Sequence, residues 1–171
     1  MQIYRRAIPG AGAGLFAAGL VAASFFVLDL IRFQPFATPG ALSGAFPGPT
    51  GYAWDFTSLS GLVAVVGAGF QIATFTLLHF LAFSMAGVLV SFFFDGKNLA
   101  GLKPLLAATA SCTAAFYGTV AASSSLVAVR SVGLVVVVSV NFFAAILMVG
   151  YLRLAAMPEP EDEPAGGLSL E

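Results

Sequence analysis

The sequence contains very few residues that carry charge, bind metals or form disulfides. Of its 171 residues only 9% are charged, and there is one cysteine and one histidine. This excludes an internal disulfide, a Cys/His zinc cage and a haem held by two histidines of one chain. Seven Lys and Arg residues stand against eight Asp and Glu residues, so the basic surplus that nucleic-acid binding needs is absent.

Apolar residues are abundant instead. They make up 59% of the chain, and the mean hydropathy is +0.97, whereas about a quarter of the residues in an ordinary soluble domain are charged. The composition therefore predicts an integral membrane protein whose surroundings are the lipid bilayer.

Four apolar stretches are long enough to cross a bilayer as helices, which takes about 20 residues each. Lipid tolerates no unpaired backbone amides, and the alternation of a barrel strand is absent, so these stretches predict helices. We expect an all-α protein in which residues 1–155 form a four-helix transmembrane bundle. The predicted spans are 8–31, 60–94, 104–129 and 131–154, with an outer loop at 32–59.

The basic residues predict the orientation. With the N-terminus inside, five of the seven are cytoplasmic and two, Arg32 and Arg130, lie outside, in agreement with the positive-inside rule. Both termini are therefore expected to be cytoplasmic, in a bacterial inner membrane. A secretory signal cleaved near Ala22 is the alternative, but the apolar run continues past Leu28 to full spanning length.

The second span is roughly 50 Å long as a helix, which exceeds the thickness of a bilayer. It either tilts or projects outside, and the aromatic residues before it, such as Trp54, favour projection because they gather at headgroup level.

In the outer loop, Thr38 and Pro39 predict the start of a short surface helix over residues 40–46. The loop is either a contact surface or a cap of the bundle. Residues 156–171 predict a disordered acidic cytoplasmic tail.

Small residues recur at helical spacing in two spans. Such stripes predict faces on which another helix approaches closely. They are Gly10, Gly14, Ala18 and Ala22 in the first span, and Ala110, Ala114 and Gly118 in the third.

Asp29 lies at the outer end of the first stripe, so its carboxylate is expected to face protein. Arg130 or Arg32 is its predicted partner on the outer side, and Gln71 could join this polar group. The carboxylate is either an interfacial group, paired or hydrated, or part of an ion or proton path.

Three polar residues are predicted at one depth on three spans: His79, Tyr117 and Asn141. Hydrogen bonds among them would fix the rotation of the helices and leave no unsatisfied group in lipid. The alternatives make His79 a ligand of haem or a chlorophyll-type pigment, a proton relay or a contact for a quinone. No cofactor is expected on balance.

The residues that common enzyme classes need are absent. The chain has no paired thiols for disulfide exchange and no phosphate-binding loop that ends in Lys-Ser or Lys-Thr. A Ser/His/acid triad is not expected either, because His79 is predicted mid-membrane whereas Asp29 and Asp55 are predicted outside. We therefore expect neither catalysis nor a metal site.

The first half of the chain resembles small uncharacterised bacterial membrane proteins with four predicted helices. The resemblance rests on the Asp29-Leu30 pair at the end of the first helix, the Thr38-Pro39 pair that opens a short outer segment, and His79 before an aromatic stretch. It implies this topology and no particular activity.

Two functions remain open. The first is a non-catalytic accessory subunit of a larger membrane complex, respiratory, photosynthetic or transport, because close-packing stripes are abundant and convergent polar groups are few. Its partners would be other integral membrane subunits or a second copy of the chain. The second is a small homo-oligomeric transporter or channel that uses Asp29, Gln71 and His79.

Overall fold

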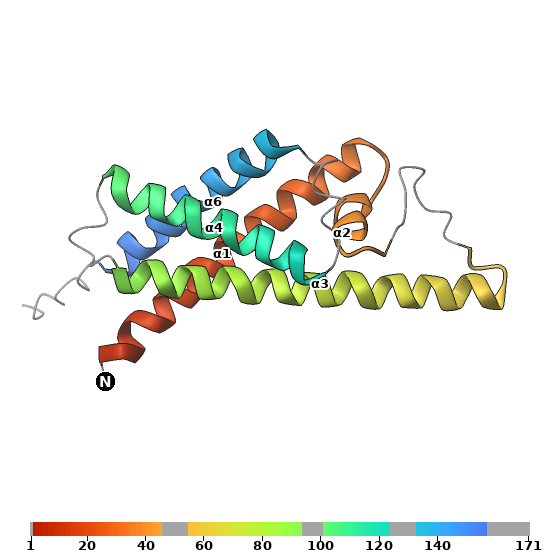
Figure 1. Cartoon of the computed structure of the whole chain (residues 1–171), viewed down its shortest axis with the longest axis horizontal. Helices are drawn as coiled ribbons and strands as arrows, with labels where there is room; N and C mark the ends of the chain where they lie inside the picture. Colours follow the sequence, from red (N-terminus) through yellow and green to blue (C-terminus); the bar gives the residue numbers. More distant parts are fainter. Residues whose placement is uncertain (1, 46–54, 94–100, 124–132, 157–171) are drawn as a thin grey trace, which may run out of the picture.

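A computed structural model describes residues 2–45, 55–93, 101–123 and 133–156. These residues form helices joined by turns, and no strand occurs among them (Figure 1). The helices are α1 (Gln2–Ile31), α2 (Ala37–Leu42), α3 (Leu59–Phe93), α4 (Leu102–Ala122) and α6 (Leu134–Ala155). The four long ones are apolar and long enough to cross a membrane, which confirms the prediction of an all-α chain with four such helices.

The observed helices follow the predicted spans, with the largest differences at two ends. α1 begins at Gln2 and not near residue 8, and α4 ends at Ala122 although residues 104–129 were expected to be helical. Several predictions lie outside the described residues: the remainder of the third span, Arg130, Trp54 and the acidic tail beyond residue 156.

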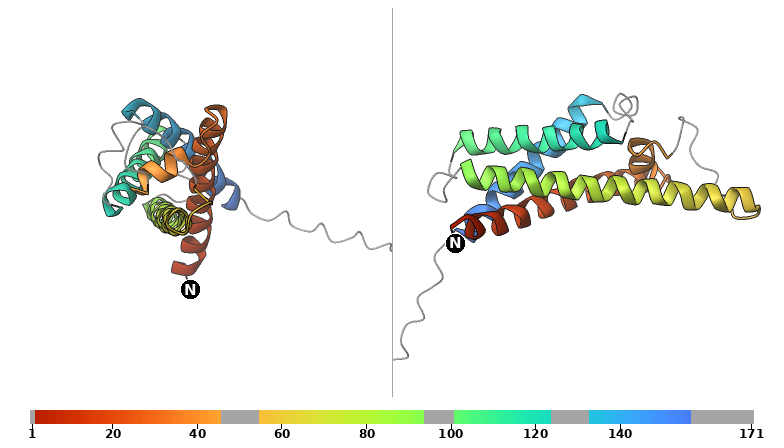
Figure 2. Two further views of the ribbon diagram at one scale, coloured as in Figure 1. Left: turned by 90° about the vertical axis from the view of Figure 1, so that its right-hand side faces the viewer. Right: turned by 60° about the horizontal axis from the view of Figure 1, so that its bottom comes forward.

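The four long helices surround a common core (Figure 2). α1 and α4 each pack against both α3 and α6. Phe83, Phe116 and Met148, from three of these helices, are fully buried among them. Lipid is as apolar as these side chains, so van der Waals packing and close backbone contact must hold the helices together.

α1 and α3 approach each other closely where they cross at three glycines. A methyl group at Gly10, Gly14 or Gly87 would overlap backbone atoms of the other helix. Nearby, the Ser91 hydroxyl of α3, which lies 2.7 Å from the Val88 carbonyl of its own helix, also lies 3.1 Å from the Arg6 carbonyl of α1 and shares its one proton between them. The predicted packing face of the first span is therefore present: Gly10, Gly14 and Ala18 are buried, and Ala22 is half-buried.

The predicted packing face of the third span does not face the other helices of the described chain. Ala110, Ala114 and Gly118 are exposed on α4, and a Cβ at Gly118 would meet open space. The buried face carries a second series at the same four-residue spacing, which is Ala108, Cys112, Phe116 and Val120. This face of α4 is the one that packs against α3 and α6, because its larger side chains make more van der Waals contacts than alanine methyl groups could.

The N-terminal part of α3 extends past the ends of the other helices (Figure 1). Its apolar side chains from Leu59 to Phe70 are largely exposed; Val63 and Val66 each retain 65% of their accessible surface. The long second span is therefore one continuous helix whose first third stands apart from the bundle.

Candidate functional site

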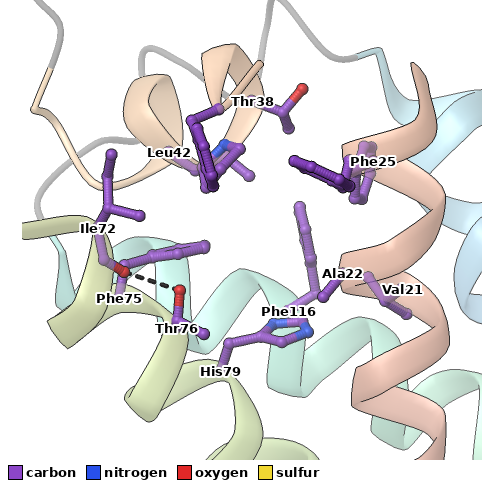
Figure 3. A pocket seen from close by; sticks show the side chains of 13 residues that line it. Val21, Ala22, Phe25, Thr38, Leu42, Ile72, Phe75, Thr76, His79 and Phe116 are labelled. Atoms are coloured by element: carbon purple, nitrogen blue, oxygen red, sulfur yellow. Dashed lines mark hydrogen bonds between the residues drawn. The ribbon is translucent and has the colours of Figure 1, made fainter. Parts of the chain in front are cut away.

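A cavity of about 200 Å³ lies between α1, α2, α3 and α4. Its walls are apolar, and His79 of α3 lies at one end with its ring extending toward Val21 and Ala22 of α1 (Figure 3). The lining residues are Val21, Ala22, Phe25, Phe26, Phe36, Thr38, Pro39, Leu42, Ile72, Phe75, Thr76, His79 and Phe116.

The short helix α2 closes one side of this cavity. It contributes Thr38, Pro39 and Leu42 to the lining, and Leu42 is buried. The predicted helix over residues 40–46 is therefore only partly correct, because the observed helix begins earlier, at Ala37, and ends earlier, at Leu42. Leu42 of this helix covers the cavity inside the bundle, which agrees with the second of the two roles predicted for the loop, a cap of the bundle.

Asp29 holds the N-terminus of α2 in place. Its carboxylate, 1% exposed, accepts hydrogen bonds from the Thr38 backbone N–H at 2.7 Å and the Thr38 hydroxyl at 2.6 Å. Phe36, the residue before α2, has a left-handed backbone and provides no side-chain cap. Asp29 of α1 thus caps the first turn of α2, a role that a side chain of the preceding loop normally has.

The other end of α2 is joined to α4. The Ser123 hydroxyl, just after α4, lies 2.9 Å from the Leu42 carbonyl and 2.9 Å from the Val120 carbonyl of α4, and it shares its one proton between them. With Asp29 at the first turn and Ser123 at the last, α2 is fixed over the cavity at both ends.

His79 is surrounded by aromatic rings and lacks a hydrogen-bond partner. The residue is 4% exposed, and its ring centroid lies 4.5 Å from that of Phe83 and 6.2 Å from that of Phe75. Neither ring nitrogen has a hydrogen bond. A buried polar group left unpaired costs about 1–3 kcal/mol, so the retention of this histidine in the core calls for an explanation.

The predicted polar cluster does not form in the described chain. His79 has no hydrogen bond to Tyr117 or Asn141. The Asn141 side-chain amide donates instead to the Val137 carbonyl of its own helix at 2.8 Å, while its Oδ1 has no partner. α3 and α6 lie on opposite sides of the bundle (Figure 2). His79 and Asn141 can therefore lie at the same depth in the membrane without contact between their side chains.

The predicted outer polar group is only partly present. Asp29 is buried as expected, but its two hydrogen bonds come from Thr38, and Arg32 and Gln71 are exposed. Arg130 lies outside the described residues. The described parts of the chain contain no group of three His, Cys, Asp or Glu residues that could hold a metal ion.

Part of this site is predictable from the sequence. The pattern indicates His79 and the Thr38-Pro39 helix start, but it does not indicate the link between Thr38 and Asp29. Their separation of nine residues matches no local capping pattern, because capping residues are normally within a few positions of the helix start. The cavity had no signal, since it depends on how four helices pack.

No protein-family model, curated protein or solved structure matches this chain. The function must therefore be argued from the site and surface described above.

Proposed function

We propose that the protein is a non-catalytic subunit of a larger membrane assembly, respiratory, photosynthetic or transport, in a bacterial inner membrane with both termini in the cytoplasm. The observation that carries the proposal is the exposed apolar surface on the first third of α3, formed by Leu59, Leu62, Val63, Val66 and Phe70. We call it the α3 extension.

The length of α3 supports a position of the extension at or beyond the membrane boundary. Its 35 residues correspond to roughly 50 Å, whereas the hydrocarbon core is about 30 Å thick. A polar cap precedes the helix: Asp55 accepts hydrogen bonds from Thr57 and Ser58, and the Ser58 hydroxyl accepts one from the Gly61 N–H. Apolar side chains between such a cap and the bilayer need a covering surface, and an apolar patch of this kind is typical of a protein interface.

The extension also has the small residues that a helix–helix contact needs. A Cβ at Gly67 or Gly69 would meet no atom within 4 Å. Gly67 lies four residues after Val63 and three before Phe70, on the same helical face. Another apolar helix could therefore approach the backbone of α3 closely at this point.

The test is purification from native membranes in a mild detergent, followed by mass spectrometry of the proteins that co-purify. We expect stoichiometric membrane partners. Replacing Val63 and Val66 by Asn should remove them, because two buried amides would then lack partners in the interface. Replacing Val135 and Val138 of α6, which are also exposed, by Asn is the matched control and should retain them. A particle that contains only this chain would overturn the proposal.

A small homo-oligomeric transporter or channel is the second candidate function. It is favoured by the position of Thr38, which binds Asp29 and lines the same cavity as His79. Gln71 is exposed and does not line that cavity. In proteoliposomes that report proton flux with a pH-sensitive dye, a transporter would lose flux in Asp29→Asn and His79→Leu while still assembling. A subunit would show no flux in any form, and the Asp29 variant would lose assembly or stability.

A further inference from the structure

The polar side chains in the cavity wall present no free donor to a ligand. The Thr38 hydroxyl donates to Asp29 at 2.6 Å, and the Thr76 hydroxyl donates to the Ile72 carbonyl at 2.8 Å. Each threonine oxygen has thus used its one proton and keeps acceptor capacity alone. Both ring nitrogens of His79 are buried, so this residue contributes carbon atoms to the wall. A charged or strongly polar ligand would lose its hydration here and gain too few partners in return.

The cavity opens at the surface of the bundle between α1, α2 and α3. Phe26 of α1 and Phe36, just before α2, line the cavity but are 39% and 45% exposed, and their ring centroids lie 5.5 Å apart. Thr76 of α3 also lines the cavity and is exposed. Leu42 and Phe116, in contrast, are buried wall residues (Figure 3). The first three residues therefore form the rim of the opening, and the last two belong to its interior.

The opening lies within the apolar part of α1. This helix contributes wall residues between positions 21 and 26 and ends at Ile31, so the wall lies roughly 8–15 Å before the end of the helix. The exposed side chains of α1 stay apolar up to Ile31, and the charged Arg32 follows. A bilayer has about 15 Å of hydrocarbon between its boundary and its centre. With α1 across a membrane, the opening faces the acyl chains of one leaflet.

We propose that the cavity binds the end of one acyl chain of a membrane lipid, which enters between the Phe26–Phe36 pair and Thr76. An apolar cavity of about 150 Å³ takes up benzene, so a cavity of about 200 Å³ has room for several methylene groups. A chain in the cavity gives the wall atoms the van der Waals partners that an empty cavity lacks. The proposal rests on α1 and α3 crossing a membrane, and it is independent of the α3 extension and its partners.

The test uses the full chain in nanodiscs of phosphatidylcholine that carries a photoreactive diazirine at the end of one acyl chain. After irradiation, mass spectrometry maps the labelled residues. We expect a label on Phe116, which is only 1% exposed and lines the cavity, as well as on Phe143, which is 61% exposed on α6. The label on Phe143 reports that the chain is inserted in the bilayer. Labelling of Phe143 without Phe116 would overturn the proposal, whether the cavity is empty or holds a resident molecule of another class.

Two variants test the route of entry. Thr76→Trp narrows the opening at an exposed position, so the label on Phe116 should be lost. Leu77→Trp is the matched control, because Leu77 is 70% exposed on the same helix and lies outside the cavity wall, and it should retain that label. Ala22→Leu fills the cavity from α1 and should also lose it.

The label on Phe143 and the helical circular dichroism should be unchanged in all three variants. If Ala22→Leu fails to fold, the comparison of Thr76→Trp with Leu77→Trp decides alone, because both of these positions are exposed. A label on Phe116 that persists in Thr76→Trp, or that disappears equally in Leu77→Trp, would overturn the proposed route and the site with it.

Discussion

At the scale of single residues, the most consequential polar group is Asp29. It is a buried carboxylate on α1 whose hydrogen bonds both come from Thr38, and it thereby positions the helix that closes the cavity. The sequence predicted that Asp29 faces protein, because it follows a stripe of small residues. The sequence could not reveal the partner, because the turn that brings Thr38 back to α1 depends on left-handed backbone at Phe33 and Phe36. Phenylalanine does not favour that conformation.

Removing the Asp29 carboxylate should destabilise the bundle. Asp29→Ala leaves the Thr38 N–H and hydroxyl without their acceptor, which should cost about 1–3 kcal/mol. Asp29→Asn keeps one side-chain oxygen as acceptor and should cost less. Unfolding in mixed detergent micelles, followed by circular dichroism, measures both. Equal stability of wild type and Asp29→Ala would show that the pair does not hold α2.

Asp55 should titrate at an unusually low pH. Hydrogen bonds from the side chains of Ser58 and Thr57, together with the Thr57 backbone N–H, lower the pKa of Asp55 from 3.8 to about 2. Because the folded pKa is depressed, the stabilising effect on the start of α3 is present above about pH 3.8 and is lost as the pH falls through about 2. Carbonyl NMR of the Asp55 side chain measures this pKa. Ser58→Ala should raise it, and an unchanged pKa in that variant would contradict the assignment.

At the scale of elements, the lengths and apolar character of the spans were predictable from the sequence, but the faces of the helices were predictable only in part. The stripe of the first span was correct because Gly10 and Gly14 permit an approach that larger residues forbid. In the third span two series share the four-residue spacing, and the sequence favoured the exposed one, Ala110 to Gly118. Which series faces protein depends on the shapes of α3 and α6, which no local pattern contains.

The glycine crossing should tolerate no side chain. Gly87→Ala places a methyl group against the backbone of α1 and should destabilise the bundle by about 1–3 kcal/mol, as overpacked sites do. Gly118→Ala is the matched control, because a Cβ there meets open space and alanine is the better helix former. Thermal unfolding of both variants tests the crossing. Similar losses in the two would indicate that glycine matters only through helix propensity.

At the scale of the whole molecule, the bundle contains four helices that are long and apolar enough to cross a membrane, but the α3 extension has no partner in the described chain. The sequence predicted that the second span is too long for a bilayer, and the structure shows that the excess is continuous helix. The orientation remains a prediction from the basic residues.

The proposed topology can be tested with thiols, because the single native cysteine, Cys112, is buried. Leu59→Cys, at a position that is 80% exposed, should react in intact spheroplasts with a maleimide that cannot cross the membrane. Ala156→Cys, at the far end of α6, should react only after permeabilisation. The reverse pattern would place the termini outside, and lack of reaction at position 59 in both cases would place the start of α3 within lipid or an interface.

The most direct test of the proposed subunit role is photo-cross-linking in native membranes from single positions. A photoreactive amino acid at Val66, on the α3 extension, should yield a discrete heavier product that contains another membrane polypeptide. The same amino acid at Val135, which is 79% exposed on α6, should yield lipid adducts alone. Lipid adducts alone at both positions would contradict the proposal that the α3 extension docks this protein into a larger assembly.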